Sequence, residues 1–479
     1  MARPARRLAQ RSGRQIAALG IAIVALVGTV LFMSHDAGGG RPADASLPGF
    51  GAVGTDGTAT LPSAAPVPGH EMYGFIPYWE MDSTIAAHAV DVDLTTVALF
   101  SVTQRANGSL ATSAIGYRRI TGPIGRRIIA DAHRAHRRVE ITFTSFGRAK
   151  NAAFFGSPAA QDAAIAALVR LRGTLGVDGV AVDVEDIADG DIPGYGAFVG
   201  RLRSALVRDL ATATVTATTS AGPQGAALAV AANLAGADRI FLMAYDYRTG
   251  SDAPGGLAPL ARTDGDVHTI GWSLDAYAAA GIPAGRLILG LPLYGLAWPV
   301  SSADLGAPAT GTGTVWLPRQ NLAALDAAPG PPVVDPVEQV AFLAVPRGSG
   351  WTAVYYDTPE TLAAKLAVAN ARRLAGGGLW AVGYDRGVTG YATAVAAFRA
   401  GAGDPGAGAS SSSTAPSRTP GSSESGVGRL RPGHHARSAR PRVPRRRRPR
   451  HRSPGRGTRS TERAAGNRAG RRRGDCRRS

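Results

Sequence analysis

Two carboxylates lie two residues apart at the end of a short apolar segment of this chain. Residues 178–185 read Asp-Gly-Val-Ala-Val-Asp-Val-Glu, which places Asp183 and Glu185 after a run of valines. A strand directs every second side chain to one face, so Ala181, Asp183 and Glu185 share a face of the predicted strand. Ionised carboxylates resist burial, and such a pair therefore indicates either a catalytic site or an acidic strand end that caps the next helix.

Paired carboxylates are typical of enzymes that cleave glycosidic bonds, in which one carboxyl group acts as an acid. The sequence shows no cluster of Cys and His with zinc spacing, no Walker loop and no serine nucleophile elbow. Cofactor, nucleotide and metal chemistry are therefore not expected. The pair favours sugar chemistry carried out by the protein's own side chains.

The elements that must position this pair form a regular alternation. Short apolar runs alternate with amphipathic segments, which is the pattern of repeated strand and helix units. The expected strands are 72–77, 95–102, 138–144, 179–185, 212–218, 239–245, 286–292 and 378–383. The clearest expected helices are 125–136, 159–175, 195–210, 273–280 and 359–374.

Eight such units over about 330 residues predict an α/β fold, a (β/α)8 TIM barrel with a small insertion between strands seven and eight. An open, doubly wound sheet is the alternative. Within the insertion, which runs from about residue 297 to 351, the segments 315–317 and 340–345 are expected to pair as strands.

Catalytic groups of such barrels lie where the strands end at the carboxyl face. Polar and aromatic residues cluster at these ends here. They are Tyr78 and Trp79 after the first strand, Asp183 and Glu185 closing the fourth, Tyr245 and Asp246 at the sixth, Tyr294 after the seventh and Trp380 in the eighth.

These motifs together resemble family 18 of the glycoside hydrolases, the chitinase-like group, and in particular its spore cortex-lytic and wall-associated members. The family's fourth-strand signature, Asp-x-x-Asp-x-Asp-x-Glu, is matched at Asp178, Asp183 and Glu185 but not at Ala181. Residues 243–246 resemble its Met-x-Tyr-Asp, and residues 289–295 its Gly-x-Pro-x-Tyr-Gly. Trp380 falls where the family has a tryptophan in the eighth strand.

The resemblance implies substrate-assisted hydrolysis, in which the N-acetyl oxygen of the sugar is the nucleophile and the bond is cleaved with retention. Glu185 would protonate the leaving oxygen and later activate water, and it must start protonated. Asp183 would orient the acetamide N–H, and Tyr245 would donate a hydrogen bond to the acetamide oxygen. The implied substrate is a polysaccharide with β-1,4-linked N-acetylglucosamine, such as chitin or peptidoglycan.

The resemblance also implies a set of substrate contacts around these groups. Trp380 would form the floor under the sugar, although a tryptophan at a strand end is also common as core. Further contacts are implied for Asp246, Tyr78, Trp79, Tyr294 and Asp178.

Ala181 is the one departure from the family's pattern. It removes a negative charge beside Asp183, so Asp183 is expected to ionise more readily and to lose a rotation between two poses. The departure supports a second hypothesis, a non-catalytic barrel that binds glycans without cleaving them. The retained Glu185 argues against that hypothesis.

Both ends of the chain lie outside the predicted barrel, which spans residues 70–400. Residues 1–35 combine five arginines with an apolar run at 16–33, which fits a signal sequence or an uncleaved membrane anchor. Either role predicts an extracytoplasmic protein, membrane-anchored or secreted. Residues 36–69 are rich in Gly, Ala and Pro and are expected to form a flexible spacer.

The C-terminal tail, residues 401–479, holds 21 arginines and four acidic residues, or +17 of the chain's +18 charge. Its composition predicts disorder. In an exported protein such a tail would contact anionic wall polymers or lipid headgroups rather than nucleic acid. It could make the chain a surface adhesin, or it could have no selected role, because GC-rich DNA read in an unintended frame yields similar residues. The chain is expected to be a monomer, and its sole Cys476 cannot form an intramolecular disulfide.

Overall fold

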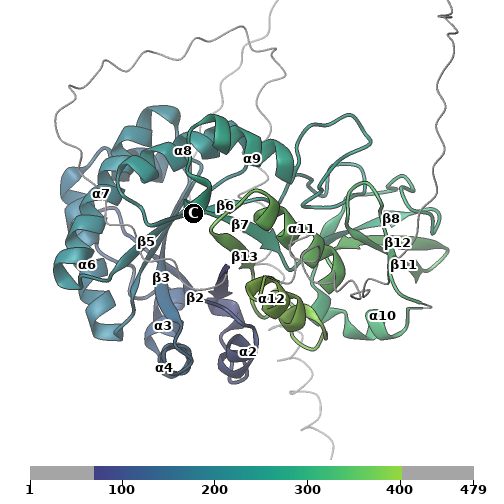
Figure 1. Ribbon diagram of the computed structural model, residues 1–479, viewed down its shortest axis with the longest axis horizontal. Coiled ribbons are helices and arrows are strands. Elements are labelled where there is room, and N and C mark those ends of the chain that lie inside the picture. The colour runs from purple at the N-terminus through teal and green to yellow at the C-terminus, as the bar shows by residue number, and fades with distance from the viewer. Residues whose placement is uncertain (1–69, 329, 402–479) are drawn as a thin grey trace, which may run out of the picture. The chain divides into compact units, whose positions relative to one another are not determined.

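The computed structural model describes residues 70–328 and 330–401, and eight parallel strands close into a barrel there (Figure 1). The strand order around the barrel is β1-β13-β7-β6-β5-β4-β3-β2, so every strand is paired on both sides. This closure confirms the TIM barrel and excludes the open sheet. The bounds are β1 Glu71–Pro77, β2 Thr96–Thr103, β3 Arg138–Phe146, β4 Gly179–Glu185, β5 Thr214–Thr219, β6 Arg239–Met243, β7 Leu287–Pro292 and β13 Gly376–Trp380.

All eight expected strands are present, and their ends differ from the predicted ones by at most three residues. The largest differences are at β5, which begins two residues later, at β6, which ends before Tyr245, and at β13, which begins two residues earlier and ends at Trp380. Tyr245 therefore lies in the loop after its strand. Consecutive glycines hid the start of β13, because Gly376 and Gly377 carry no side chain that marks a strand.

Helices cover the outside of the barrel, as Figure 1 shows for α6 to α9. The five expected helices are present, and α8, an alanine-rich helix, was not predicted because it carries no polar face that would reveal a helical period. The helices are α2 Ile85–Asp91, α3 Ile115–Thr121, α4 Pro123–Arg134, α5 Arg148–Phe155, α6 Pro158–Leu175, α7 Ile192–Asp209, α8 Gly222–Leu234, α9 Ile270–Ala279, α11 Pro359–Ala371 and α12 Tyr391–Arg399.

An aromatic core fills the barrel interior. The Phe241 ring lies 5.0 Å from the ring of Phe75 and 5.6 Å from that of Tyr73, and all three side chains are buried. Two glycines make room for it. A Cβ atom at Gly290 would lie 2.3 Å from the Phe241 ring, and one at Gly378 would lie 2.2 Å from it. The ring therefore packs where β7 and β13 have no side chains.

The insertion between β7 and β13 forms a five-stranded antiparallel sheet, which lies at the right of Figure 1. The predicted pairing of 315–317 with 340–345 was wrong, because β9 pairs with β8 whereas β11 pairs with β10 and β12. Both segments do form strands of this sheet. Its elements are β8 Gly295–Val300, β9 Thr314–Trp316, α10 Leu322–Asp326, β10 Val333–Val334, β11 Ala341–Arg347 and β12 Gly350–Tyr356.

A buried ion pair joins the inserted sheet to the loop after β6. Arg248 donates to both carboxylate oxygens of Glu338, at 2.7 and 2.6 Å, and both side chains are about 95% buried. The backbone N–H of Gly256 also donates to Glu338, at 2.7 Å. Because both charges of this pair are buried and the carboxylate of Glu338 is hydrogen-bonded by Arg248 and Gly256, the pair holds the loop and the sheet together.

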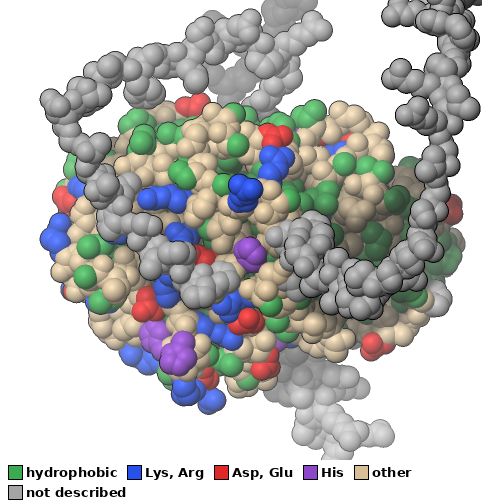
Figure 2. Space-filling view, viewed as in Figure 1, with side chains coloured by type: hydrophobic (Ala, Val, Ile, Leu, Met, Phe, Trp, Pro, Cys, Tyr) green, Lys and Arg blue, Asp and Glu red, His purple; other side chains and the backbone are tan. Residues whose placement is uncertain are grey.

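Acidic and basic side chains are interspersed on the face drawn in Figure 2, with no large area of one sign. Ion pairs also join neighbouring elements of the described chain, such as that of Arg203 with Asp238 at 2.8 Å. Among the described residues no single helix is long and apolar enough to cross a membrane, and only the pair α5 and α6, bent by 93°, passes that test together. The predicted anchor at 16–33, the spacer and the tail after residue 401 lie outside the described residues.

The fit of Phe241 between two glycines predicts that Gly378→Ala destabilises the protein. The added methyl group overpacks the barrel core, at a cost of about 1–3 kcal/mol in the free energy of unfolding. The matched control is Gly173→Ala, on the exposed face of α6, where a Cβ atom meets nothing within 4 Å. This control is expected to stabilise the protein by about 0.5–1 kcal/mol. Urea unfolding measures both, and equal stability of the two variants would refute the packing argument.

Candidate functional site

The two carboxylates project from the inner face of β4 at the carboxyl end of the barrel. Asp183 is level with Thr144 of β3 and Thr218 of β5, and Glu185 is level with Phe146 of β3. Asp183 is 4% exposed, whereas Glu185, the last residue of the strand, is half-buried at the barrel mouth. The strand thus places one carboxyl group inside the barrel and the other where a ligand reaches it.

The surroundings set different pKa values for the two groups. Burial raises the pKa of Glu185 well above its ordinary value, and the charges of Asp183, Asp246 and Asp186 raise it further. Burial also raises the pKa of Asp183, to about 6, while a hydrogen bond from the Thr218 hydroxyl lowers it. With a pKa of about 6, Asp183 is largely ionised at neutral pH, whereas burial and three neighbouring carboxylates favour the protonated form of Glu185. This is the division of roles that a pair of catalytic carboxyls needs.

Ala181 puts a methyl group, in place of a carboxylate, in the layer of the barrel below Asp183. Its side chain is fully buried and is level with Thr142 of β3 and Thr216 of β5. The hydroxyl of Thr142 has no hydrogen-bond partner among the described residues. Without a carboxylate at this level, no negative charge there raises the pKa of Asp183. Its pKa still lies above the ordinary value because the group is buried.

Two tyrosines and Asp246 follow β6 and β7 at the same end of the barrel. The rings of Tyr245 and Tyr294 are 6.3 Å apart and nearly perpendicular, and the Tyr294 hydroxyl donates to Asp246 Oδ1 at 2.5 Å. Burial raises the pKa of Tyr245, and the charges of Asp246, Asp183 and Glu185 raise it further. Tyr245 therefore keeps its proton and can act as a hydrogen-bond donor.

Asp246 has a left-handed backbone conformation, with φ at +60°. This conformation is costly for a residue other than glycine, although aspartate tolerates it better than most. The structure keeps Asp246 against Tyr294 in spite of that cost, which is typical of residues at functional sites.

Trp380 closes the aromatic wall of the barrel mouth. Its ring lies 4.8 Å from Phe100, 5.5 Å from Phe75 and 6.4 Å from Trp79. Trp79 and Tyr78 belong to the short 3₁₀ helix η1 (Tyr78–Glu80), in which their rings are 4.9 Å apart. Each of these three side chains is half-buried, so each keeps an accessible surface. Such faces suit the apolar face of a pyranose ring.

Asp178 does not lie with the other predicted site residues. It precedes β4 at the opposite end of the strand, where its carboxylate accepts from the Val139 N–H at 2.7 Å and pairs with His133 at 2.8 Å. Glu185 lies seven positions further along the strand, a distance of roughly 23 Å. Its role is to fix β3, β4 and α4, and the substrate contact that the resemblance implied finds no support in this position.

A buried polar relay, which the sequence analysis missed, holds the turn after Glu185. Gln104 donates to Ser145, Ser145 to Asn151 Oδ1, and Asn151 Nδ2 donates to the carbonyl oxygens of Glu185 at 2.6 Å and Asp186 at 3.2 Å. All three relay side chains are at least 96% buried. Gln104 directly follows β2, Ser145 lies in β3 and Asn151 in α5, so no spacing in the sequence could have connected them.

Glu80 is a second residue that was missed. It is 3% exposed, stands beside Trp79 and pairs with Arg319 at 2.6 Å and Arg386 at 2.5 Å. Burial raises the pKa of Glu80 to about 7, while Arg386 lowers it. The cluster joins the loops after β1 and β13 to the insertion. Trp79 is also fixed from the other side, by its indole N–H donating to the Tyr384 hydroxyl at 3.0 Å.

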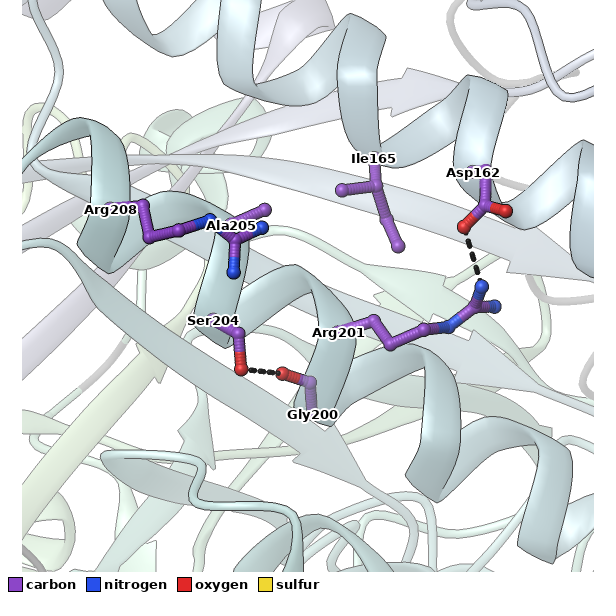
Figure 3. A pocket seen from close by; sticks show the side chains of 7 residues that line it. All are labelled: Asp162, Ile165, Gly200, Arg201, Ser204, Ala205 and Arg208. Carbon is purple, nitrogen blue, oxygen red and sulfur yellow. Dashed lines mark hydrogen bonds and ion pairs between the residues drawn. The ribbon is translucent and has the colours of Figure 1, made fainter.

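Other features of the described chain do not offer a competing site. No group of three or more His, Cys, Asp or Glu side chains in that part could hold a metal ion. A surface cavity of about 260 Å³ lies between α6 and α7 (Figure 3). In this cavity Arg201 forms an ion pair with Asp162 at 2.5 Å, and the Ser204 hydroxyl donates to the Gly200 carbonyl at 2.8 Å. The residues that line it include no aromatic side chain.

The comparison with families of known proteins agrees with this geometry. The model of the family described as "Glycosyl hydrolases family 18" matches residues 72–385, which includes the whole barrel mouth. The chain belongs to glycosyl hydrolase family 18. The closed barrel is the fold expected for this family. Ala181 is the position at which this chain departs from the family's fourth-strand motif.

Curated relatives of this family 18 protein match over part of their length. It is 28% identical over 169 residues to Nod factor hydrolase protein 1 of Medicago truncatula, which covers 34% of this chain and 43% of the relative. It is 26% identical over 265 residues to a probable endochitinase of Caenorhabditis elegans, covering 50% and 42%. The chain therefore spans less than half the length of the curated relatives it matches.

Solved structures share the fold at low sequence identity. A Group IV chitinase of Ostrinia furnacalis in complex with allosamidin has a TM-score of 0.60 at 17% identity, covering 70% of this chain and 100% of that one. A mutant class V chitinase of Cycas revoluta in complex with (GlcNAc)3 has 0.58 at 19%, covering 68% and 99%. The spore cortex-lytic enzyme SleL of Bacillus cereus has 0.55 at 16%, covering 69% and 74%.

The relay behind Glu185 predicts that Asn151→Leu destabilises the protein by about 2–3 kcal/mol, because two buried carbonyl groups lose their donor. The matched control is Asn370→Leu, since the buried amide of Asn370 has no partner among the described residues. That control is expected to be neutral or stabilising. Urea unfolding of the two variants measures the difference, and a loss at Asn370 as large as that at Asn151 would show that the relay adds nothing.

Proposed function

We propose that this protein is a glycosidase that hydrolyses β-1,4-linked N-acetylglucosamine-containing glycans, chitin-like or peptidoglycan, by substrate-assisted retaining catalysis. The observation that carries the proposal is the pair at the end of β4, in which neighbouring carboxylates disfavour the charge of Glu185 while Thr218 donates a hydrogen bond to Asp183. Three negatively charged neighbours and burial all act on Glu185 in the same direction. A purely structural carboxylate would instead have partners that favour its charge.

The first half of the proposed reaction breaks the glycosidic bond. The carboxyl of Glu185 gives its proton to the bridging oxygen while the carbonyl oxygen of the sugar's own acetamide attacks the anomeric carbon. The C–O bond to the leaving sugar breaks, and an oxazolinium ring closes. Glu185 is left as a carboxylate at the half-open barrel mouth, where water can reach it.

Asp183 and Tyr245 are proposed to hold the acetamide during this step. The carboxylate of Asp183 accepts from the acetamide N–H and stabilises the positive charge that develops on the ring. The Tyr245 hydroxyl donates to the acetamide oxygen and orients it toward the anomeric carbon. Asp246 adds polar contacts to the same sugar, and Trp380, Tyr78, Trp79 and Tyr294 supply aromatic surface.

The second half returns the enzyme to its first state. Glu185 removes a proton from a water molecule, whose oxygen attacks the anomeric carbon and opens the oxazolinium ring. Two displacements at one carbon leave the product with the configuration of the substrate. The proton that Glu185 lost is thereby restored.

A non-catalytic glycan-binding barrel is the second candidate, and Ala181 is the observation that favours it. Loss of the usual carboxylate at this position weakens the control of Asp183 that other family members have. Such a protein would have no use for a protonated Glu185 at the barrel mouth, which makes the hydrolase the better-supported function.

We further propose that the protein acts outside the cytoplasm as a monomer, anchored or released through residues 16–33. The arginine-rich tail would then meet anionic wall polymers or lipid headgroups. The reaction at the barrel mouth requires neither the anchor nor the tail.

The reaction predicts that Glu185→Gln in the full chain lowers the rate of glycan cleavage at least ~100-fold, because the amide cannot donate the proton. Chitooligosaccharides and peptidoglycan glycan strands serve as substrates, and mass spectrometry of the products identifies the bond that is cut. The matched control is Glu360→Gln, the same substitution on an exposed glutamate of α11, which is expected to leave the rate unchanged.

Three results of this assay would decide between the candidates. Cleavage by the wild type and by Glu360→Gln but not by Glu185→Gln supports the hydrolase. Equal product from all three proteins would sink the assigned role of Glu185. Binding of the oligosaccharides without any cleavage, unchanged in Glu185→Gln, would establish the glycan-binding alternative.

The two pKa values predict a bell-shaped dependence of kcat/KM on pH. On the acidic side kcat/KM rises as Asp183 loses its proton, with a midpoint near the pKa of about 6. On the basic side it falls as Glu185 loses the proton that it must donate, since its pKa lies well above the ordinary value. Initial rates between about pH 4 and 9 measure the profile. An acidic midpoint near that of an ordinary exposed carboxyl would contradict the role of the buried Asp183.

A further inference from the structure

One neutral hydrogen-bond donor holds the buried carboxylate of Asp183. Thr218 of β5 is level with Asp183 in the sheet, is 2% exposed and donates its hydroxyl to Asp183 Oδ1. The same hydroxyl lies 3.3 Å from the carbonyl oxygen of Val182, which fixes its position between the two strands. Thr218 was absent from the residues predicted to form the site.

The layer beneath Asp183 contains no carboxylate that could take this part. Ala181, Thr142 and Thr216 share that layer, and the Thr142 hydroxyl has no partner among the described residues. Thr216 donates instead to Glu140, at 3.2 Å.

Glu140, on β3, is level with Gly179, two residues before Ala181 on β4, and is therefore one layer further from Asp183. It is 2% exposed and accepts from the hydroxyls of Tyr73 and Thr214, each at 2.6 Å. The carboxylate of Glu140 is therefore hydrogen-bonded near the amino end of the barrel, away from the barrel mouth and from Asp183.

We infer that Thr218 is the positioning residue for Asp183, and that its hydroxyl sets both the orientation and the ionised state of that carboxylate in place of the acidic residue that position 181 lacks. The inference rests on the proposed hydrolytic function for its meaning in catalysis. That the Thr218 hydroxyl controls the Asp183 carboxyl group is inferred from the hydrogen bond between them and does not depend on that function.

The other groups that face Asp183 cannot supply this control. In the proposed reaction Glu185, on the same strand, starts protonated. Once it has given up its proton, its negative charge repels that of Asp183. Burial and nearby carboxylates, including Asp183, raise the pKa values of Tyr195 of α7 and Tyr245 after β6, so both keep their protons. Among the described residues, however, the Tyr195 hydroxyl has no hydrogen-bond partner, and Thr218 is the hydrogen-bond donor that acts on the pKa of Asp183. Among the influences on Asp183, burial raises its pKa and only the hydrogen bond from Thr218 lowers it.

The test replaces the hydroxyl while keeping the shape. Thr218→Val is isosteric and removes the donor, Thr218→Ser keeps the donor, and Thr142→Val removes an equally buried threonine hydroxyl one layer below. Carbon-13 NMR of carboxyl-labelled aspartate in the full chain follows the titration of Asp183, whose signal is assigned by its loss in Asp183→Asn. Thr218→Val is expected to raise the pKa of Asp183 by about one unit, whereas Thr218→Ser and Thr142→Val leave it unchanged.

Kinetics on chitooligosaccharides give the second readout. In Thr218→Val the acidic limb of the kcat/KM profile should move to higher pH by the same amount, and kcat at the optimum should fall about tenfold because Asp183 is free to rotate. Thr218→Ser should restore both. Circular dichroism checks the fold of each variant, and Thr218→Ala, a smaller side chain, replaces Thr218→Val if the latter does not fold.

The two readouts separate this inference from the proposed function. An unchanged titration of Asp183 in Thr218→Val, or an equal shift in Thr142→Val, would overturn the role of Thr218 whatever the activity. Absence of cleavage by the wild type would overturn the hydrolase, while the titration would still support or refute the control of Asp183 by Thr218.

Discussion

A carboxyl group that keeps its proton at the mouth of a closed barrel is the constraint on which the rest of this structure depends. Glu185 lies at the end of β4, where burial and the charges of Asp183, Asp246 and Asp186 all disfavour its ionised form. Such a group is costly for folding, since the influences that the described residues exert on it all disfavour its charge. Around it, Asn151 fixes the backbone, Thr218 donates a hydrogen bond to Asp183, and the rings of Trp380 and Phe100 pack against each other.

The barrel core fixes the register of the strands, and the ion pairs at its rim fix the loops. Inside, Phe241 packs against Gly290 and Gly378, and this dense core keeps the strands in a register that sets Asp183 level with Thr218. At the rim, ion pairs between distant segments hold the loops, with Arg248 and Glu338 joining the loop after β6 to the inserted sheet. Rigid placement of this kind is what a site needs when its acid must meet the bridging oxygen of a bound glycan.

The strands and the carboxylate pair were predictable because their signals are local. A run of valines ending in Asp183 and Glu185 encodes a strand and the face that its side chains share. The helix α8 lacked a polar face, and the partners of β9 and β11 depended on contacts between segments that no period links. For the same reason Thr218 and Asn151 were not foreseen, since their value comes from register across strands. Asp178 matched the family's motif but serves the other end of its strand, which shows that a match in sequence does not by itself give a residue's role.

The central claim is that the substrate's own acetamide attacks the anomeric carbon while Glu185 supplies the proton. Proton NMR of chitooligosaccharide hydrolysis, recorded before the product anomers interconvert, measures it most directly. The account predicts that the new reducing end appears first as the β-anomer, because two displacements at one carbon retain the configuration of the β-1,4 bond. An α-anomer appearing first would mean direct attack by water, and it would contradict the mechanism built on Glu185, Asp183 and the acetamide.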